Sequence, residues 1–322
     1  MTESSFGYRT GAMEIVADTN LLSKNAIVTG GYSGIGLETT RALASAGANV
    51  TIACRDIDRA KSVVAKLNES LGSVKVKAMQ LDLSSLESIQ SFSKSWLSEN
   101  NELHILINNA AIMACPESKT NDGFEAQFGT NHLGHFSLTT QLLPALKRAG
   151  SSRVVCLSST GHFLSPVVFD DINFEARPYD PWSSYGQSKT ACALMARAIQ
   201  DRYADLGIEA FSVHPGGIMT TLQRHMSEED ITSRGWVDKE GNVNERFKTV
   251  EQGASTSVWA ATAESLKGSG GVYLEDCGIA TEHHEIPESR TGVMAYAIDS
   301  DNADRLWETS LQMIERAKTI EN

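Results

Sequence analysis

The chain has 322 residues, of which 41% are hydrophobic, so it can bury a large core as one α/β domain. Its formal net charge of −12 argues against nucleic acid as a partner, because nucleic-acid-binding proteins usually present a basic surface. The five cysteines are scattered and form no CxxC pair, which favours a reducing compartment over a disulfide-linked scaffold.

The sequence carries no signal for export or membrane insertion. The first 20 residues lack the apolar run of a secretion signal. The longest apolar run, 103–115, is interrupted by two asparagines and is too short to span a bilayer. We therefore expect a soluble, cytoplasmic protein without a membrane partner.

From residue 25 onwards, short β-branched runs alternate with amphipathic stretches. This alternation predicts a parallel sheet covered by helices on both faces, that is, a single-domain α/β fold with a doubly wound Rossmann sheet. The expected strands are 26–29, 49–53, 75–80, 104–107, 153–157, 208–213 and 271–274, and the expected helices are 35–46, 58–71, 85–99, 124–149, 182–203 and 250–263.

The expected domain covers 25–290, and several segments lie outside its regular alternation. Residues 1–24 form a predicted polar arm, and 160–181 is a predicted irregular loop with three prolines. The polar segment 216–248 directly follows a strand end, which is typical of a substrate loop or lid. Residues 291–322 form a C-terminal segment with an expected helix at 301–318, capped by Ser300.

A glycine-rich turn, TGGYSGIG at 29–36, lies between the first expected strand and the first expected helix. A tight turn, close backbone approach to phosphates and close helix packing each require a glycine, and the helix N-terminus then meets a pyrophosphate. An ordinary glycine-rich connection is the alternative. The residues expected at a dinucleotide are Gly30, Tyr32, Ser33, Gly34, Ile35 and Gly36.

The end of the second strand indicates which dinucleotide binds. NAD sites usually place a carboxylate there, whereas an arginine accommodates the 2′-phosphate of NADP. This chain has Cys54 followed by Arg55, which favours NADP over NAD. The alternative is that Arg55 is a surface residue paired with Asp56 or Asp58.

The motif YGQSK at 185–189 places a phenol and an ammonium one helical turn apart, on one face of a helix. The ammonium favours negative charge on the phenol oxygen, so Tyr185 can give a proton to a carbonyl or take one from an alcohol. Together with a dinucleotide-binding turn, Tyr185 and Lys189 predict hydride transfer between a nicotinamide and a small-molecule carbonyl or alcohol.

Several motifs in a fixed order resemble the short-chain dehydrogenase/reductase family, in particular its retinol-dehydrogenase-like and WW-domain-oxidoreductase-like branch, although no WW module is present. The resemblance covers about residues 22–280. The motifs are TGGYSGIG at 29–36, LDLSS at 81–85, NNAA at 108–111, NHLGHF at 131–136, VVCLSS at 154–159, YGQSK at 185–189 and HPGGIMT at 214–220.

The resemblance implies a catalytic set of Asn131, Ser159, Tyr185 and Lys189. In this set the serine hydroxyl holds the substrate oxygen, and Asn131 places a water that links Lys189 to solvent. Ser158 is the alternative for the serine role.

The resemblance also extends the cofactor site beyond the glycine-rich turn. An aspartate would bind the adenine amine, the NNAA segment would line the ribose, and the turn after the sixth strand would border the nicotinamide. Ala111 stands where the family usually has glycine, and Thr221 is the alternative to Thr220. The residues implied are Asp82, Leu83, Asn109, Ala110, Pro215, Gly216, Ile218 and Thr220, together with Tyr185 and Lys189.

Apolar side chains in the loop 160–181 and the lid 216–248 favour a bulky hydrophobic substrate, although they could instead pack against the sheet. A dinucleotide-binding redox sensor or scaffold without turnover is the alternative function. Helices 124–149 and 182–203 form a dimer interface in many relatives, whereas the C-terminal helix could cap that surface, so a homo-oligomer and a monomer both remain open. No metal is expected at His132 and His135 or at the EHHE run 282–285.

Overall fold

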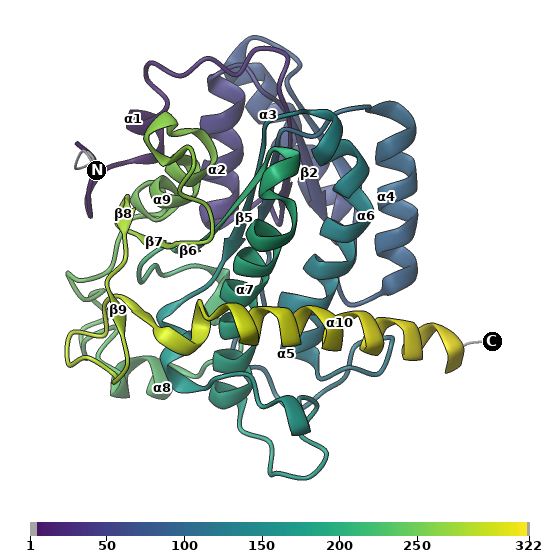
Figure 1. Ribbon diagram of the computed structural model, residues 1–322. Helices are drawn as coiled ribbons and strands as arrows, with labels where there is room; N and C mark the ends of the chain where they lie inside the picture. Colours follow the sequence, from purple (N-terminus) through teal and green to yellow (C-terminus); the bar gives the residue numbers. More distant parts are fainter. Residues whose placement is uncertain (1–4, 321–322) are drawn as a thin grey trace.

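The computed structural model describes residues 5–320 and is built on one central sheet (Figure 1). The strand order is β3-β2-β1-β4-β5-β6-β7-β8, in which every neighbouring pair is parallel except β7 and β8. The strands are β1 (Asn25–Thr29), β2 (Asn49–Cys54), β3 (Val76–Gln80), β4 (Ile105–Asn108), β5 (Ser152–Leu157), β6 (Ile208–His214), β7 (Tyr273–Glu275) and β8 (Gly278–Ile279).

From β1 the chain adds β2 and β3 on one side of the sheet and then returns to add β4 and the later strands on the other side. This change of side between β1 and β4 creates a crevice at the carboxyl ends of these two strands. Helices cover both faces of the sheet, and each face has its own buried apolar cluster. This arrangement confirms the predicted doubly wound Rossmann fold in one domain. One face carries α2 (Gly34–Ser45), α3 (Ile57–Leu71) and α9 (Val250–Thr262), and the other carries α4 (Leu86–Glu99), α6 (Gly134–Arg148) and α7 (Pro181–Tyr203).

The helix expected at 124–149 is interrupted. The structure has α5 (Ala126–Phe128), a π-helical turn η1 (Gly129–Leu133) and then α6. The turn is closed by the backbone N–H of Gly134, which donates to the Gly129 carbonyl. The start of α6 lies directly against the loop after β3, because a Cβ at Gly134 would stand 2.3 Å from the Leu83 carbonyl oxygen.

The N-terminal arm packs against the rest of the domain, as far as residues 5–24 show. It contains a short helix, α1 (Ala12–Ile15), whose Ala12 and Ile15 side chains are buried and which packs against α9. Residues 5–24 therefore include a buried helical turn that the sequence analysis did not predict. Residues 1–4 of the arm lie outside the described residues.

The C-terminal segment contains two short parallel strands, β9 (Glu282–His283) and β10 (Val293–Met294), followed by helix α10 (Ser300–Ile320). The predicted Ser300 cap is wrong by one residue, because Asp299 Oδ1 accepts the backbone N–H of Asn302 at 2.8 Å. Ser300 is instead the first residue of the helix.

Helix α10 crosses the outer face formed by α6 and α7 (Figure 1). Its Trp307 is 6% exposed, and the indole lies 4.7 Å from the Phe136 ring and 5.8 Å from the Tyr203 ring. Arg202 of α7 forms an ion pair with Asp304 at 2.5 Å. Helix α10 therefore occupies the face that the family resemblance assigns to a dimer contact. No helix within residues 5–320 is long and apolar enough to cross a bilayer.

A buried histidine lies at the contact between the π-helical turn and α10. His132 is fully buried, and its Nε2 lies 2.8 Å from Ser310 Oγ, which itself donates to the Leu306 carbonyl. His132 therefore donates from Nε2. Burial lowers the pKa of His132 from 6.5 to about 3.

We expect this imidazole to make folding less stable in acid. Below pH 6.5 the His132 side chain binds a proton in the unfolded chain but stays neutral in the folded chain. The free energy of unfolding therefore falls as the pH drops towards 3. Between pH 7 and pH 5 this single group should cost about 2 kcal/mol of unfolding free energy. Urea unfolding of the wild type and of His132→Gln at both pH values would measure the difference. Identical pH dependence of the two proteins would contradict a neutral buried His132.

Candidate functional site

Three of the four predicted catalytic residues lie on two neighbouring elements. Ser159 follows the end of β5 and precedes a 3-10 turn, η2 (Thr160–Leu164), whereas Tyr185 and Lys189 lie in the first turns of α7. This helix begins where Asp180 accepts the Ser183 backbone N–H at 2.6 Å.

Gly161 brings the serine and the tyrosine together. A Cβ placed on this glycine would stand 2.7 Å from Tyr185 Cε1 and 3.5 Å from Ser159 Oγ, so the phenol ring packs directly on the Gly161 backbone. The Gly161 N–H donates to Ser159 Oγ at 3.0 Å. Because this contact uses a lone pair of Oγ, the Ser159 hydroxyl hydrogen is left for another acceptor. The sequence analysis did not identify Gly161.

The neighbouring serine has a different environment. Ser158 Oγ donates to the Lys189 backbone carbonyl at 2.8 Å and is buried against α7. Its hydroxyl hydrogen is therefore already used within the protein, in contrast to that of Ser159.

Lys189 is buried beneath the tyrosine. Its Nζ donates to the Leu157 carbonyl at 2.9 Å and lies 5.7 Å from the centre of the Tyr185 ring. The ammonium is thus fixed by the end of β5 at a distance from which it acts electrostatically on the phenol.

Asn131 lies in the π-helical turn η1, a kind of irregularity that is frequent at functional sites. Its side-chain amide donates to the Ile112 carbonyl and to Ser188 Oγ, both at 2.9 Å, and accepts the Ile112 N–H. The Asn131 side chain is therefore engaged within the protein. A water near it would have to use its backbone carbonyl, which already accepts from His135 Nδ1 at 2.8 Å.

His135 has a partner on each nitrogen. Besides the Asn131 carbonyl, it contacts Thr29 Oγ1 through Nε2 at 2.9 Å, and burial lowers the pKa of His135 to about 4. His132 and His135 thus bond to protein oxygens. No group of three metal-binding side chains is found in the described part of the chain.

The glycine-rich turn has the geometry that its sequence predicts. Gly30 and Gly34 have φ angles of 66° and 53°, which favour glycine. A Cβ on Gly36 would stand 2.6 Å from both the Gly30 carbonyl oxygen and Asn109 Nδ2, so α2 starts in close contact with two loops. Ser33 precedes α2 without a capping hydrogen bond from its side chain.

The NNAA segment supports this turn from the next strand. Asn109 Nδ2 donates to the Thr29 carbonyl at 2.7 Å, and the backbone N–H groups of Asn109 and Ala110 donate to Thr29 Oγ1. Thr29 thus joins the ends of β1 and β4 on either side of the crevice.

The loop after β6 comes to the other side of the turn. A Cβ on Gly34 would stand 3.5 Å from the Thr220 side chain, so Thr220 faces the start of α2. The Gln223 side chain holds this loop by donating to the Ile218 carbonyl and accepting the Thr220 N–H, both at 2.9 Å. Gln223 was not predicted from the sequence.

Arg55 follows β2 and is exposed, and it forms no ion pair within residues 5–320. The two acids considered as its partners have other contacts. Asp56 caps α3 by accepting the Arg59 N–H at 3.1 Å, and Asp58 lies 3.7 Å from Lys61 Nζ. Arg55 is therefore available to an anionic ligand at the adenosine end.

Three further residues lie at the end of the crevice proposed to hold the adenosine. Arg59 lies over the Tyr32 ring at 5.5 Å, which adds a second cation next to the glycine-rich turn. Asp82, after β3, accepts the Ser84 N–H at 2.9 Å, and this bond orients its carboxylate. Leu83 is buried against the start of α6. These residues, with the glycine cradle, fit a dinucleotide laid across the carboxyl ends of β1 to β4.

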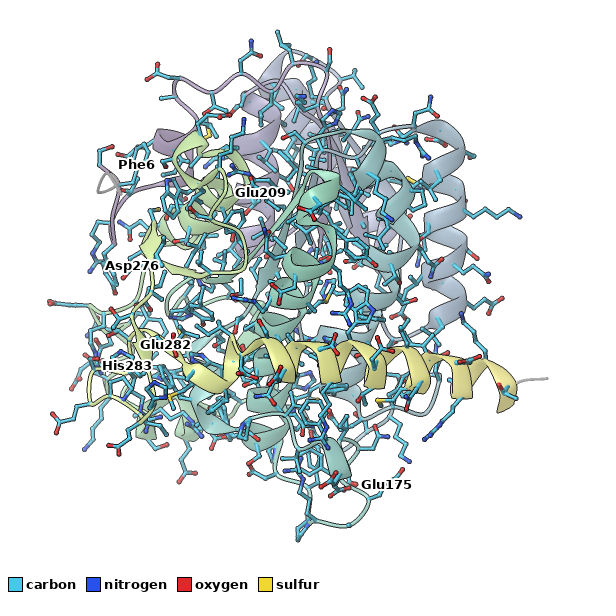
Figure 2. The ribbon with its side chains drawn as sticks, in the orientation of Figure 1. Phe6, Glu175, Glu209, Asp276, Glu282 and His283 are labelled. Atoms are coloured by element: carbon cyan, nitrogen blue, oxygen red, sulfur yellow. The ribbon has the colours of Figure 1, made fainter. Side chains whose placement is uncertain are left out.

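The segment 216–248 is closed at its base. It contains a 3-10 turn, η5 (Thr221–Gln223), and α8 (Glu228–Ser233), and the Lys248 N–H donates to the Gly217 carbonyl at 2.8 Å. Lys248 is buried, and its Nζ pairs with Asp276 at 2.5 Å. In Figure 2, Asp276 lies on the same side of the molecule as Phe6 of the N-terminal arm.

The arm also contacts this segment. Arg9 donates to the Glu245 and Phe247 carbonyls at 2.6 and 3.1 Å, and Tyr8 donates to the Arg246 carbonyl. The N-terminal arm therefore holds the end of the lid, a role that the sequence did not indicate.

Aromatic rings connect the segment 216–248 to Tyr185. Trp182 on α7 lies 6.3 Å from the Tyr185 ring and 6.2 Å from Trp236 of the lid, and both pairs are edge-to-face. Arg234 stacks on Trp182 at 3.8 Å. Trp182 was not singled out in the sequence, because nothing local showed that the lid would reach it.

The loop 160–181 contributes mainly to packing. Phe163 and Val167 are buried, and the Phe169 ring is covered by Arg305 of α10 at 4.2 Å. For these residues the structure supports packing rather than lining of a substrate pocket.

Glu282 and His283, both labelled in Figure 2, lie in β9 near the start of α10.

Residues 24–231 match the short chain dehydrogenase family. The chain belongs to this family of oxidoreductases. It is 41% identical over 317 residues to "Short-chain dehydrogenase/reductase prx1" of Penicillium roqueforti, covering 95% of this chain and 90% of the relative.

Other relatives cover similar lengths. A "Probable oxidoreductase" of Streptomyces antibioticus is 45% identical over 90% of this chain and 97% of its own length. "Retinol dehydrogenase 12" of Homo sapiens is 38% identical over 92% and 88%. Among solved structures, a putative uncharacterized protein from Mycobacterium paratuberculosis has a TM-score of 0.71 at 30% identity, with coverage of 95% and 98%.

We expect Gly161→Ala to impair the candidate site. The added methyl group would stand 2.7 Å from Tyr185 Cε1, so the phenol ring must move away from residue 161. A displacement of about 1 Å can cost roughly 100-fold in rate. Steady-state turnover and cofactor affinity should be measured together, with Gly7→Ala as control, because a Cβ at Gly7 meets nothing within 4 Å. Wild-type turnover of Gly161→Ala would contradict the tight packing.

Proposed function

We propose that this protein is an NADP(H)-dependent oxidoreductase that interconverts a ketone or aldehyde and an alcohol, with Tyr185 as the acid and base. The observation that carries the proposal is that Ser159 Oγ and the Tyr185 ring both contact Gly161, while Lys189 Nζ lies 5.7 Å from the centre of the Tyr185 ring. A phenol, a hydroxyl donor and a buried ammonium at one point can protonate and hold a carbonyl oxygen.

NADPH supplies the hydride when it is bound. In reduction, Tyr185 donates its hydroxyl proton to the substrate oxygen while Ser159 donates a hydrogen bond to the same oxygen. The Lys189 ammonium favours the negative charge that develops on the phenol oxygen as its proton leaves. In oxidation, Tyr185 takes the proton back from the alcohol.

The choice of NADP rests on the end of β2. Cys54 stands where NAD sites usually have an acid, and the exposed Arg55 side chain can meet a 2′-phosphate. Arg59 adds positive charge beside Tyr32. A solved structure described as "Pseudomonas aeruginosa RhlG/NADP active-site complex" has a TM-score of 0.61 at 25% identity, covering 80% of this chain and 97% of that one.

A bulky hydrophobic substrate is proposed from the lid. Trp182 and Trp236 form an aromatic wall that begins next to Tyr185. Met219, Leu222 and Met226 of the same segment are partly exposed and add apolar surface. A site of this kind favours large apolar carbonyl compounds over small hydroxy acids.

The proposed function is tested by following NADPH and NADH oxidation at 340 nm with carbonyl compounds from small aldehydes to decalin-sized ketones. We expect turnover with NADPH on the bulky ketones. NADPH binding by fluorescence without turnover in either direction would contradict the proposal and favour a redox sensor or scaffold.

We expect Tyr185→Phe to lose nearly all turnover and to keep its affinity for NADPH, because only the proton donor is removed. A loss of at least about 100-fold in kcat is typical of removing a positioned acid. The matched control is Tyr203→Phe on the same helix, where the ring packs against Trp307 of α10. Substantial turnover by Tyr185→Phe would remove Tyr185 from the acid role.

We expect Arg55→Asp to weaken NADPH binding far more than NADH binding, because only NADPH has the 2′-phosphate. The loss of a charge-assisted contact should cost about 10- to 100-fold in NADPH affinity. Arg316→Asp, on an exposed position of α10, makes the same change in charge and serves as the control. Equal losses for both cofactors would show that Arg55 acts through general charge or folding.

A further inference from the structure

His162 connects the predicted catalytic serine to the C-terminal part of the chain. It lies in η2, three residues after Ser159, and its side chain is fully buried. Its Nδ1 lies 2.7 Å from the Ser159 carbonyl oxygen, and its Nε2 lies 3.1 Å from the backbone nitrogen of Met294 in β10.

These two contacts determine where the imidazole proton resides. A carbonyl oxygen only accepts, so Nδ1 must carry the hydrogen, and a backbone N–H only donates, so Nε2 must present its lone pair. A neutral imidazole satisfies both partners, whereas an imidazolium would lose the Met294 contact. Burial lowers the pKa of His162 to about 4, in agreement with the neutral form near pH 7.

Ser159 is held by three hydrogen bonds that involve this turn. Its carbonyl oxygen accepts from the His162 backbone N–H at 3.0 Å and from His162 Nδ1 at 2.7 Å. Its Oγ accepts from the Gly161 N–H at 3.0 Å. The backbone and the side chain of Ser159 are therefore both fixed, which sets the direction in which its hydroxyl can point.

The other side of His162 is fixed by residues distant in sequence. The Tyr296 hydroxyl donates to the His162 carbonyl at 2.6 Å. The imidazole lies 4.1 Å from the Phe163 ring and 5.2 Å from the Tyr273 ring. Met294 and Tyr296 lie beyond residue 231, where the match to the family ends.

We infer that His162 is a positioning residue that orients Ser159 towards the substrate oxygen. The bond from the Tyr296 hydroxyl to the His162 carbonyl makes this orientation depend on the docking of residues 293–297. This inference rests on the proposed function, in which the Ser159 hydroxyl binds that oxygen. A preorganised donor contributes to rate only if its direction is fixed before the reaction. His162 supplies that fixation without touching the substrate.

Two substitutions separate the contacts of the imidazole. His162→Asn places an amide N–H near the position of Nδ1 and keeps the donor to the Ser159 carbonyl. The amide of His162→Gln reaches the position of Nε2 and keeps an acceptor for the Met294 N–H. The Ser159 carbonyl then loses the hydrogen bond that Nδ1 donates in the wild type. We expect His162→Asn to remain close to wild-type kcat and His162→Gln to lose about 10- to 100-fold in kcat. KM and NADPH affinity should change little in either variant.

A double-mutant comparison shows whether the effect passes through the serine. In a Ser159→Ala background, where the hydroxyl is absent, kcat should no longer distinguish His162→Asn from His162→Gln. Equal losses in the two single variants, or a difference that persists without the Ser159 hydroxyl, would assign His162 to packing and overturn the inference.

Two further measurements keep the outcomes distinct. If the His162 variants do not fold, Tyr296→Phe removes the hydrogen bond from the Tyr296 hydroxyl to the His162 carbonyl and leaves the imidazole intact. The kcat of Tyr296→Phe should fall severalfold, and an unchanged kcat would overturn the inference.

A wild-type protein without turnover on any carbonyl would contradict the proposed function, and the role of His162 would fail with it. Wild-type turnover that Ser159→Ala abolishes, with equal His162 variants, would contradict the inference alone.

Discussion

A buried ammonium at the end of β5 is the constraint on which the candidate site depends. Lys189 is 3% exposed, donates to the Leu157 carbonyl at 2.9 Å and forms no ion pair within residues 5–320. Burying a charge without a counter-ion is costly, so negative charge nearby is favoured. The phenol oxygen of Tyr185, whose ring centre lies 5.7 Å from Nζ, is a candidate for that charge. The parallel sheet brings this arrangement to the same edge as the glycine-rich turn.

The sequence predicted most of the sheet and the placement of Tyr185 and Lys189 on one helix, because both have local signals. β-Branched runs located the parallel strands to within one or two residues, and the YGQSK spacing placed Tyr185 and Lys189 on one helix face. The π-helical turn around Asn131 was missed, since it depends on contacts with Ile112 and Ser188. Gly161 was missed for a similar reason: its importance comes from a ring that belongs to another element.

The segments outside the regular alternation are joined to the site by long-range contacts. The N-terminal arm holds the base of the lid through Arg9, and Lys248 fixes the same base to Asp276. The C-terminal segment reaches Ser159 through His162. Composition identified these segments as irregular, but hydrogen bonds to backbone carbonyls leave no trace in sequence patterns. The regular α/β layers and these irregular segments thus meet at the carboxyl ends of β5 and β6.

We propose that one bound dinucleotide spans the crevice from Arg55 to Tyr185, and a crystal structure of the protein with NADP would test this. We expect the 2′-phosphate to contact the Arg55 guanidinium, the pyrophosphate to lie on the N-terminus of α2, and the nicotinamide to face the Tyr185 hydroxyl. A 2′-phosphate away from Arg55, or a nicotinamide outside reach of Tyr185, would contradict it.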